Sequence, residues 1–335
     1  MSKDKKKKTI AILRGGKHDY HRSMKSGANV MLSLSKYPEE TNVIDVVIDE
    51  KGNWFEKGIP SDVHRVFSKA DYYVDFTHDV KGDHHNLGSK LDVKQVFKND
   101  FVNILSRVNI KRILNQIGLN TSRYVVFRDD KNLENSLKEI WGKFQTPIIV
   151  KDGKHIANKK SLLTYSFLDT YKRIKEILKS GSEAILEEHV DGKYISLSVI
   201  PNYRGEDLYI PTPIETINAE NKIRSVQGKE IKDKYLPEHS HNKISLFHLD
   251  DDTKKRLKYL AKEIHKGLAL DYHVLIDICL VKNKKGTEIK ILELHTNPHL
   301  SEESRFSFIL ENSGVDMGRF VLDNIEKLEE ENLSY

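Results

Sequence analysis

The sequence is poor in cysteine and in long apolar runs. Cys279 is its single cysteine, which excludes an internal disulfide and is most simply a buried core thiol in a reducing, cytoplasmic compartment. No window approaches 18 apolar residues, so no transmembrane helix and no membrane partner are expected. The apolar segment after the first lysines, residues 9–13, is too short for the hydrophobic core of a signal peptide.

Several familiar motifs are also missing. The chain has neither the G-x-x-x-x-G-K-[ST] phosphate loop nor the G-x-G-x-x-G turn, which disfavours P-loop enzymes and dinucleotide-binding proteins. It has no G-x-S-x-G nucleophile elbow, which disfavours the hydrolases that depend on one. Basic residues are not interleaved with aromatic residues as in single-strand binders. No nucleic-acid partner is therefore expected.

What the chain does contain is typical of a globular protein with more than one domain. Its 335 residues exceed what one hydrophobic core usually serves. Hydrophobic residues make up 38% and charged residues 31%, a balance that argues against disorder. Much of the formal net charge of +5 comes from residues 3–8, "KDKKKK". We interpret this basic tail as a solvated terminus rather than a nucleic-acid arm.

Strand and helix signals alternate along the chain. A short buried strand at residues 9–13 precedes a Gly-Gly turn and a helix at 22–36, and two further strands end near Asp49 and Phe76. This order predicts a small parallel α/β domain of about 85 residues. Beyond it, the sequence predicts helices at 101–117, 133–144 and 252–268, and strands at 123–127, 147–151, 183–190, 194–200, 207–213, 273–281 and 288–295.

Two carboxylates interrupt apolar strands near the C-terminal end. Asp277 lies within "HVLIDICLV" and Glu293 within "EIKILELH", and a hairpin loop joins the two. Adjacent antiparallel strands would bring both side chains within reach of one cation. Mg²⁺ uses such a pair when nucleotide phosphates supply its remaining ligands. The alternative for Glu293 is a salt-bridged edge position, because perturbed carboxylates also occur in structural pairs.

Three further charged residues are candidates to meet the same nucleotide. Lys111 on a helix and Lys151 at a strand end could contact phosphates as point charges. The alternative for Lys151 is an exposed lysine that merely ends its strand. Glu187 follows the apolar "AIL", where its carboxylate could accept an adenine amino hydrogen.

The order of these motifs resembles the ATP-grasp carboxylate-amine ligases, and among them the D-alanine–D-alanine ligases, over about residues 8–328. The segments that carry the resemblance are "IAILRGGKHDYHRSMKSGANVMLSL", "FTHDVKGD", "KRILNQIGLNT", "PIIVK", "AILEEHVDGKYISLSVI", "IKDKYL", "VLIDICLV" and "ILELHTNP". It implies an α/β protein with the ATP-grasp fold and an N-terminal Rossmann-like domain. The expected divisions are a basic tail at 1–8, an α/β substrate domain at 9–86, a central ATP-grasp subdomain at 87–190, and a C-terminal subdomain at 191–330 with the metal and substrate site.

The resemblance also implies a role for each matching residue. It assigns phosphate binding to Lys111 and Lys151, the adenine side to Glu187 and Val190, the transferring phosphate to Lys234, Mg²⁺ (or Mn²⁺) to Asp277, Glu293 and His295, and the substrate to Asp19, His78 and Ser304. Asp19 would receive the ammonium group of the first substrate. The alternative is that Asp19 caps the helix that begins near Arg22.

The chain departs from the family pattern at five places. Residues 152–163, "DGKHIANKKSLL", offer one glycine where the family has a flexible Gly/Ser-rich loop over the phosphates. Tyr194 replaces a ribose-binding glutamate, and Leu275 an arginine that stabilises the charged intermediate. His295 replaces a metal-binding asparagine, and imidazole is softer than Mg²⁺ prefers. His299 replaces a glycine of the oxyanion site.

Three interpretations remain. The first is a D-alanine–D-alanine ligase or near relative, which forms a peptide bond through an acyl phosphate with ATP and Mg²⁺ and serves peptidoglycan synthesis. The second is an ATP-grasp ligase for a different amino acid or amine, favoured by Leu275 and His299. The third is a catalytically weakened, nucleotide-binding regulatory protein, favoured by the altered phosphate loop. The expected partners are small-molecule substrates, and a homodimer is compatible with the resemblance.

Overall fold

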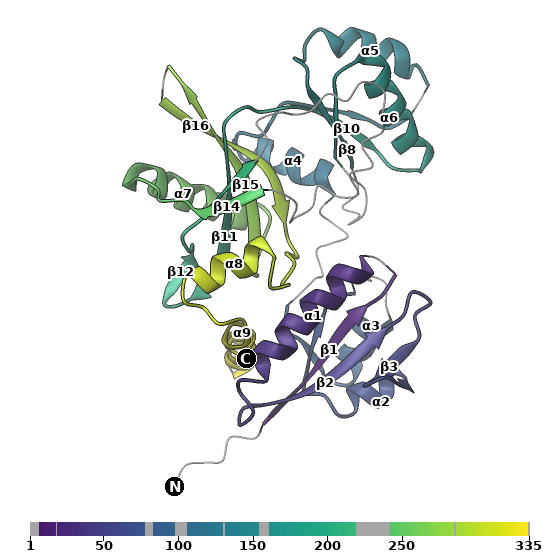
Figure 1. The fold of residues 1–335 in the computed structure, drawn as a ribbon, viewed down its shortest axis with the longest axis vertical. Helices are drawn as coiled ribbons and strands as arrows, with labels where there is room; N and C mark the ends of the chain where they lie inside the picture. Colours follow the sequence, from purple (N-terminus) through teal and green to yellow (C-terminus); the bar gives the residue numbers. More distant parts are fainter. Residues whose placement is uncertain are drawn as a thin grey trace. The chain divides into compact units, whose positions relative to one another are not determined.

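The computed structural model describes residues 7–17, 19–77, 83–97, 106–129, 131–153, 161–218, 242–284 and 286–333. The chain divides into two compact units (Figure 1). The first unit combines residues 1–101 with 297–335, and the second spans residues 102–296. The C-terminal segment thus returns to the N-terminal α/β unit, whereas the domain boundaries expected near residues 87 and 191 stay a prediction.

The first unit is built around a mixed sheet of order β4-β3-β2-β1-β5-β6. Its strands are β1 (Lys8–Gly15), β2 (Thr41–Ile48), β3 (Trp54–Glu56), β4 (Ile59–Ser61), β5 (Tyr72–Asp75) and β6 (Lys94–Gln95). Strands β2, β1 and β5 are parallel, as predicted, and β6, which was not predicted, pairs parallel with β5. The antiparallel hairpin of β3 and β4 was not predicted, because three-residue strands are too short to show alternation.

The described residues of the same unit also form helices. They are α1 (Tyr20–Leu34), α2 (Val63–Phe67), α3 (Asp83–Lys90), α8 (Arg305–Asn312) and α9 (Met317–Leu333). Figure 1 shows α1 along β1 and β2, where it buries Val30 and Leu34. Helix α9 packs against α1, and a Cβ atom at Gly318 would lie 2.5 Å from the carbonyl oxygen of Ser33. Glycine therefore allows this close helix approach.

The second unit begins with an antiparallel sheet of order β7-β10-β8-β9. Its strands are β7 (Tyr124–Phe127), β8 (Ile148–Asp152), β9 (Leu162–Thr164) and β10 (Ala184–Glu188). Figure 1 shows α5 (Leu133–Trp141) and α6 (Phe167–Lys179) together beside this sheet. Both helices contribute to one core with the sheet, in which Leu137, Ile148, Ile174 and Leu186 are fully buried.

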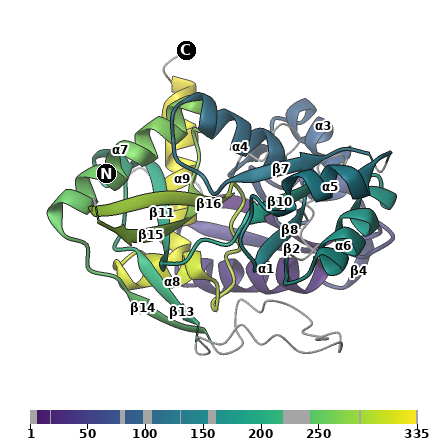
Figure 2. The same cartoon turned by 90° about the horizontal axis from the view of Figure 1, so that it is seen from above.

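A larger sheet of order β14-β13-β11-β15-β16 completes the second unit, with β12 paired to β11. Its strands are β11 (Lys193–Tyr203), β12 (Glu206–Tyr209), β13 (Ile214–Asn218), β14 (Asn242–Leu246), β15 (Val274–Asn283) and β16 (Gly286–His295), accompanied by helices α4 (Arg107–Gln116) and α7 (Asp251–Gly267). Figure 2 shows β11, β15 and β16 side by side. The strand predicted to reach Pro213 ends at Tyr209 instead, because Pro211 and Pro213 lack the N–H that a ladder needs.

The predicted hairpin of β15 and β16 is confirmed. The strands pair antiparallel, and Asp277 lies directly opposite Glu293, next to an irregularity in the register.

No helix in the described part of the chain is long and apolar enough to cross a membrane.

Candidate functional site

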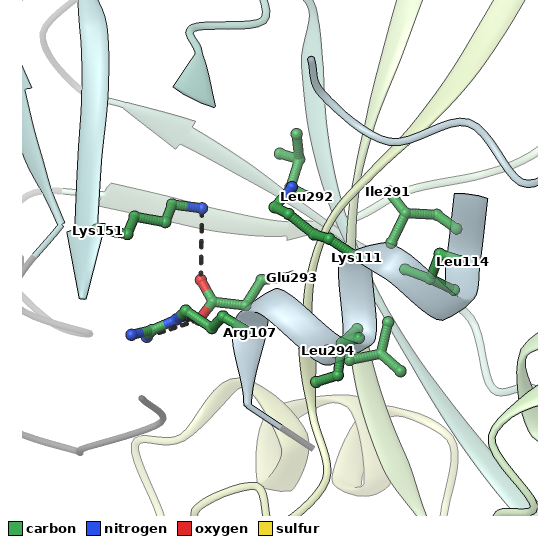
Figure 3. A pocket seen from close by; sticks show the side chains of 9 residues that line it. Arg107, Lys111, Leu114, Lys151, Ile291, Leu292, Glu293 and Leu294 are labelled. Atoms are coloured by element: carbon green, nitrogen blue, oxygen red, sulfur yellow. Dashed lines mark hydrogen bonds and ion pairs between the residues drawn. The ribbon is translucent and has the colours of Figure 1, made fainter. Parts of the chain in front are cut away.

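A pocket in the second unit lies where α4 meets β16 (Figure 3). Its lining residues are Arg107, Ile110, Lys111, Leu114, Lys151, Ile291, Leu292, Glu293 and Leu294. Figure 3 shows Arg107, Lys151 and Glu293 together on one side, and Leu114 and Ile291 on the other. A pocket with an apolar wall and a charged end suits a ligand that has an apolar part and an anionic part.

Helical spacing aims part of this lining into the pocket. Arg107, Lys111 and Leu114 are four and three residues apart on α4, so their side chains share one helix face. Ser106 caps the helix by accepting a hydrogen bond from the backbone N–H of Asn109 at 3.2 Å. Lys111 was predicted from the sequence, but Arg107 was not. Its position one helical turn before Lys111 was the signal that could have found it.

Glu187 lies between the two predicted phosphate lysines. Its Oε1 is 2.9 Å from Lys111 Nζ, and its Oε2 is 3.1 Å from Lys151 Nζ. The Ser122 hydroxyl donates to Glu187 and accepts from Lys111. Glu187 is 1% exposed and Lys151 is 6% exposed. The alternative of an exposed, strand-ending Lys151 is therefore wrong, whereas the adenine role of Glu187 stays a prediction.

Burial and charge compete at each member of this group. Burial acts to raise the pKa of Glu187, but Lys151 and Lys111 outweigh it and hold that pKa below its ordinary value. Burial lowers the pKa of Lys111, and Glu187 offsets this only in part. Lys151 is also desolvated, yet its pKa is raised because Glu187 and Glu293 both face it. Both carboxylates act on both lysines, but Glu293 is the last of the causes for Lys111 and a leading one for Lys151, and the charge of Lys151 further lowers the pKa of Lys111.

Glu293 is held by Arg107 in the same pocket. Arg107 Nε and Nη2 both lie 2.8 Å from Glu293 Oε1, and Arg107 Nη1 donates to the carbonyl oxygen of Asp152 at 3.1 Å. Lys151 Nζ lies 3.9 Å from Glu293 Oε2. The partner that a carboxylate in an apolar strand requires is thus a pair of cations, in agreement with the salt-bridge alternative. Its proposed role with a metal stays a prediction.

Asp277 forms the other half of the predicted metal pair. Ser196 donates to Asp277 Oδ1 at 2.6 Å, and His295 Nε2 lies 2.9 Å from Asp277 Oδ2. Over the described ranges, no group of three or more His, Cys, Asp or Glu side chains could hold a metal ion by itself. The facing carboxylates of Asp277 and Glu293 fit Mg²⁺ only if a ligand such as a polyphosphate completes the coordination. His295 is therefore a hydrogen-bonding partner of Asp277.

Tyr194 occupies the predicted adenine side. Its hydroxyl donates to the carbonyl oxygen of Val190 at 2.5 Å and lies 3.3 Å from His189 Nε2. Burial raises the pKa of Tyr194 to about 12, so the phenol stays protonated and donates. Val190 is 6% exposed. Tyr194, which by the resemblance replaces a ribose-binding glutamate, is therefore hydrogen-bonded to the backbone of Val190, which was predicted to line the adenine.

The predicted substrate residues Asp19 and Ser304 both belong to the first unit. Asp19 precedes α1 with φ of 51°, and its side chain makes no capping hydrogen bond, so the helix-cap alternative is wrong. Ser304 is 2% exposed and caps α8 by accepting from the backbone N–H of Ser307 at 3.1 Å. His78 and Lys234 lie outside the described residues.

Helix α1 holds the segment that follows β16, residues 299–303. Leu300 is bound through its backbone: its N–H donates to Ser26 Oγ at 3.2 Å, and its carbonyl accepts from Asn29 Nδ2 at 2.7 Å. Lys25 and Glu303 form an ion pair at 2.7 Å. This segment contains His299, the residue in the place of the family's oxyanion-site glycine, so α1 fixes its position within the first unit.

The sequence and the structure are similar to known ligases. The family described as "D-ala D-ala ligase C-terminus" matches residues 113–326. A D-alanine–D-alanine ligase from Carboxydothermus hydrogenoformans is 23% identical over 226 residues, or 67% of each chain. The structure of D-alanyl-alanine synthetase A from Vibrio cholerae matches with a TM-score of 0.76 at 18% identity, over 96% of this chain and 98% of the other.

A second solved structure is that of a D-alanine–D-alanine ligase from Bacillus anthracis in complex with ATP. It matches with a TM-score of 0.70 at 15% identity, over 96% of each chain. These likenesses confirm the fold predicted from the sequence. Because the family match spans more than half of the chain, the protein belongs to the D-alanine–D-alanine ligase family of ATP-dependent ligases with the ATP-grasp fold.

Proposed function

We propose that the protein joins a carboxylate to an amine through an acyl phosphate, with the nucleotide phosphates held in the pocket of the second unit. The observation that carries this proposal is the set of three cations, Arg107, Lys111 and Lys151, around the carboxylates Glu187 and Glu293. Because the carboxylates hold these cations in place, the cations can bind an anion without rearranging. Arg107 suits this task because its planar guanidinium matches a phosphate group.

The reaction has two balanced steps. A substrate carboxylate oxygen attacks the terminal phosphorus of ATP, which forms the acyl phosphate and releases ADP. The amine then attacks the acyl carbon, a proton leaves the nitrogen, and inorganic phosphate departs with the electrons of the broken C–O bond. Arg107 and Lys151 would offset the charge on the transferring phosphoryl group. Asp277 and Glu293 would hold Mg²⁺, which supplies Lewis-acid stabilisation of the phosphate oxygens.

The finer assignments are part of the same proposal. An amino-acid ammonium would be received at Asp19, as in a ligase of D-alanine, and the product would then serve the bacterial cell wall from the cytoplasm. A homodimer is compatible with this role. The second candidate is a ligase for another amino acid, favoured by Leu275, which is 4% exposed and carries no charge, and by His299. A weakened nucleotide-binding protein would keep the pocket without the turnover.

Nucleotide binding is the first test. Mg-ATP at about one hundred times its Kd should stabilise the protein by about 2.7 kcal/mol and raise the melting temperature. Replacing Arg107 by glutamine should weaken ATP binding by about 10- to 100-fold, because a charge-assisted contact contributes about 1.5–3 kcal/mol. Arg128→Gln is the matched control, since Arg128 is an exposed arginine of the same unit that pairs with Glu183. A melting temperature unmoved by millimolar Mg-ATP would contradict the proposal.

A further inference from the structure

Three charged or polar side chains meet at the start of α1 in the first unit. Arg22 Nη1 lies 3.4 Å from Asp19 Oδ2 and 3.3 Å from His299 Nε2. His299 Nε2 lies 3.7 Å from Asp19 Oδ2. Asp19 and His299 come from distant parts of the chain, and their side chains are 6% and 15% exposed. Arg22 is the most exposed of the three, at 28%.

Hydrogen-bond chemistry sets the charge of this group. A guanidinium has five N–H donors and no acceptor, so His299 Nε2 must accept from Arg22 through its lone pair. The proton of the imidazole in this contact is then on Nδ1. Asp19 contributes one negative charge and Arg22 one positive charge. Between these two side chains the charges offset each other, and Asp19 is not an isolated anion waiting for an ammonium group.

The pairing of Asp19 with Arg22 restricts what these side chains can bind. Some substrates would bring only an ammonium group to this site. That ammonium would be a second cation beside Arg22, next to the Asp19 carboxylate that Arg22 already neutralises. A substrate that also has a carboxylate would present an acceptor to Arg22 at the same time. A guanidinium can bind a carboxylate through two parallel N–H donors. The accepting nitrogen of His299 helps to hold Arg22 in one orientation.

We propose, on the basis of the ligase function proposed above, that the amino-acid substrate received by the first unit is dicarboxylic. Its ammonium contacts Asp19 and one carboxylate contacts Arg22, while the other carboxylate is the one that is phosphorylated. Two carboxylates are needed because a carboxylate held by a guanidinium has its lone pairs engaged and is a poor nucleophile. Arg22 is then a specificity-determining residue, and His299 is a positioning residue that acts through Arg22.

Equilibrium binding to the full-length protein with Mg-ADP tests this without turnover. The probes are the D and L forms of aspartate and glutamate, their amides asparagine and glutamine, and D-alanine. We expect one acidic amino acid to bind at least tenfold more tightly than its own amide. Arg22→Gln should abolish this preference, whereas Arg65→Gln, a change at an exposed arginine of the same unit, should keep it.

The role of His299 is tested by a pair of variants. His299→Gln retains a side-chain oxygen that can accept from Arg22 and should keep the preference for the acid, whereas His299→Leu should lose it. Equal binding of acid and amide, a preference that survives Arg22→Gln, or no binding of any acidic amino acid would each overturn the proposal. Failure of the ligase function would appear separately, as no phosphate release with any amino acid or dipeptide despite binding of Mg-ATP. Phosphate release driven by D-alanine alone would leave the ligase function standing and overturn this inference.

Discussion

The Glu187→Ala variant is expected to lose about 3–5 kcal/mol of unfolding free energy, the usual effect of breaking a buried ion pair. Glu187 is 1% exposed and is the shared partner of Lys111 and Lys151, which are 5% and 6% exposed. Without it, two buried ammonium groups face each other with Glu293 as the remaining nearby carboxylate. Burying charges without partners is costly, so the second unit should unfold at lower denaturant concentration.

The pH dependence of this effect follows from the lowered pKa of Glu187. A carboxylate whose pKa is lower in the folded protein stabilises the fold above its ordinary pKa of 4.5, and this contribution is lost as the pH falls through the folded value. The difference in stability between wild type and Glu187→Gln should therefore shrink in acid. The pKa values of Lys111 and Lys151 shift in opposite directions. Stability at alkaline pH therefore does not report on the contribution of Glu187, Lys111 and Lys151 by itself.

Denaturant titrations of the ligand-free protein measure both effects. Glu183→Ala is the matched control, because Glu183 lies just before β10 and forms an ion pair with Arg128 at the surface. Such a pair contributes about 0–1 kcal/mol. Equal stability of Glu187→Ala and Glu183→Ala would show that the buried group of Glu187, Lys111 and Lys151 does not hold the second unit together.

A second large effect is expected at Asp277. Asp277→Asn keeps the shape of the side chain opposite Glu293 but removes a hard anionic ligand. The loss of several kcal/mol of charge stabilisation at the phosphates corresponds to a decrease of about 10²–10³-fold in substrate-dependent phosphate release. Removal of divalent metal with a chelator should have the same effect on the wild type and little further effect on the variant.

Steady-state phosphate release by variants of matched melting temperature provides the measurement. Glu288→Gln is the control, because Glu288 lies on the neighbouring strand β16, opposite Val281 of β15, and does not line the pocket. If Asp277→Asn releases phosphate at the wild-type rate, Asp277 is not a metal ligand. Its contacts with Ser196 and His295 would then be purely structural.

The hairpin of β15 and β16 could be predicted because its signal is local. Carboxylates that interrupt two apolar strands joined by a short loop must meet if the strands pair, and Asp277 does lie opposite Glu293. Glu187 is a different case: it joins Lys111, 76 residues away in the sequence, and nothing in local periodicity reports such a pairing. Lysine is usually exposed, so residue type alone could not predict a buried Lys151.

The surroundings of Asp19 could be predicted only in part. The substrate role of Asp19 stays a prediction, and its left-handed backbone and the absence of a side-chain cap depend on the turn that enters α1. Arg22 and His299 are separated by 277 residues and are brought together by the return of the C-terminal segment to the first unit. Sequence patterning treats such residues independently, which is why their joint effect on the charge at Asp19 was missed.

The most direct test of the central claim follows an oxygen atom. An amino-acid substrate found by a phosphate-release screen is labelled with ¹⁸O in its carboxylates and incubated with Mg-ATP, the amine substrate and the protein. An acyl-phosphate ligase must transfer one ¹⁸O atom to each inorganic phosphate released, because the C–O bond breaks when the amine attacks. We predict phosphate that contains one ¹⁸O atom, released about 10²–10³-fold more slowly by Asp277→Asn. Unlabelled phosphate, or no release with any amino acid or dipeptide despite ATP binding, would contradict the assignment as a ligase.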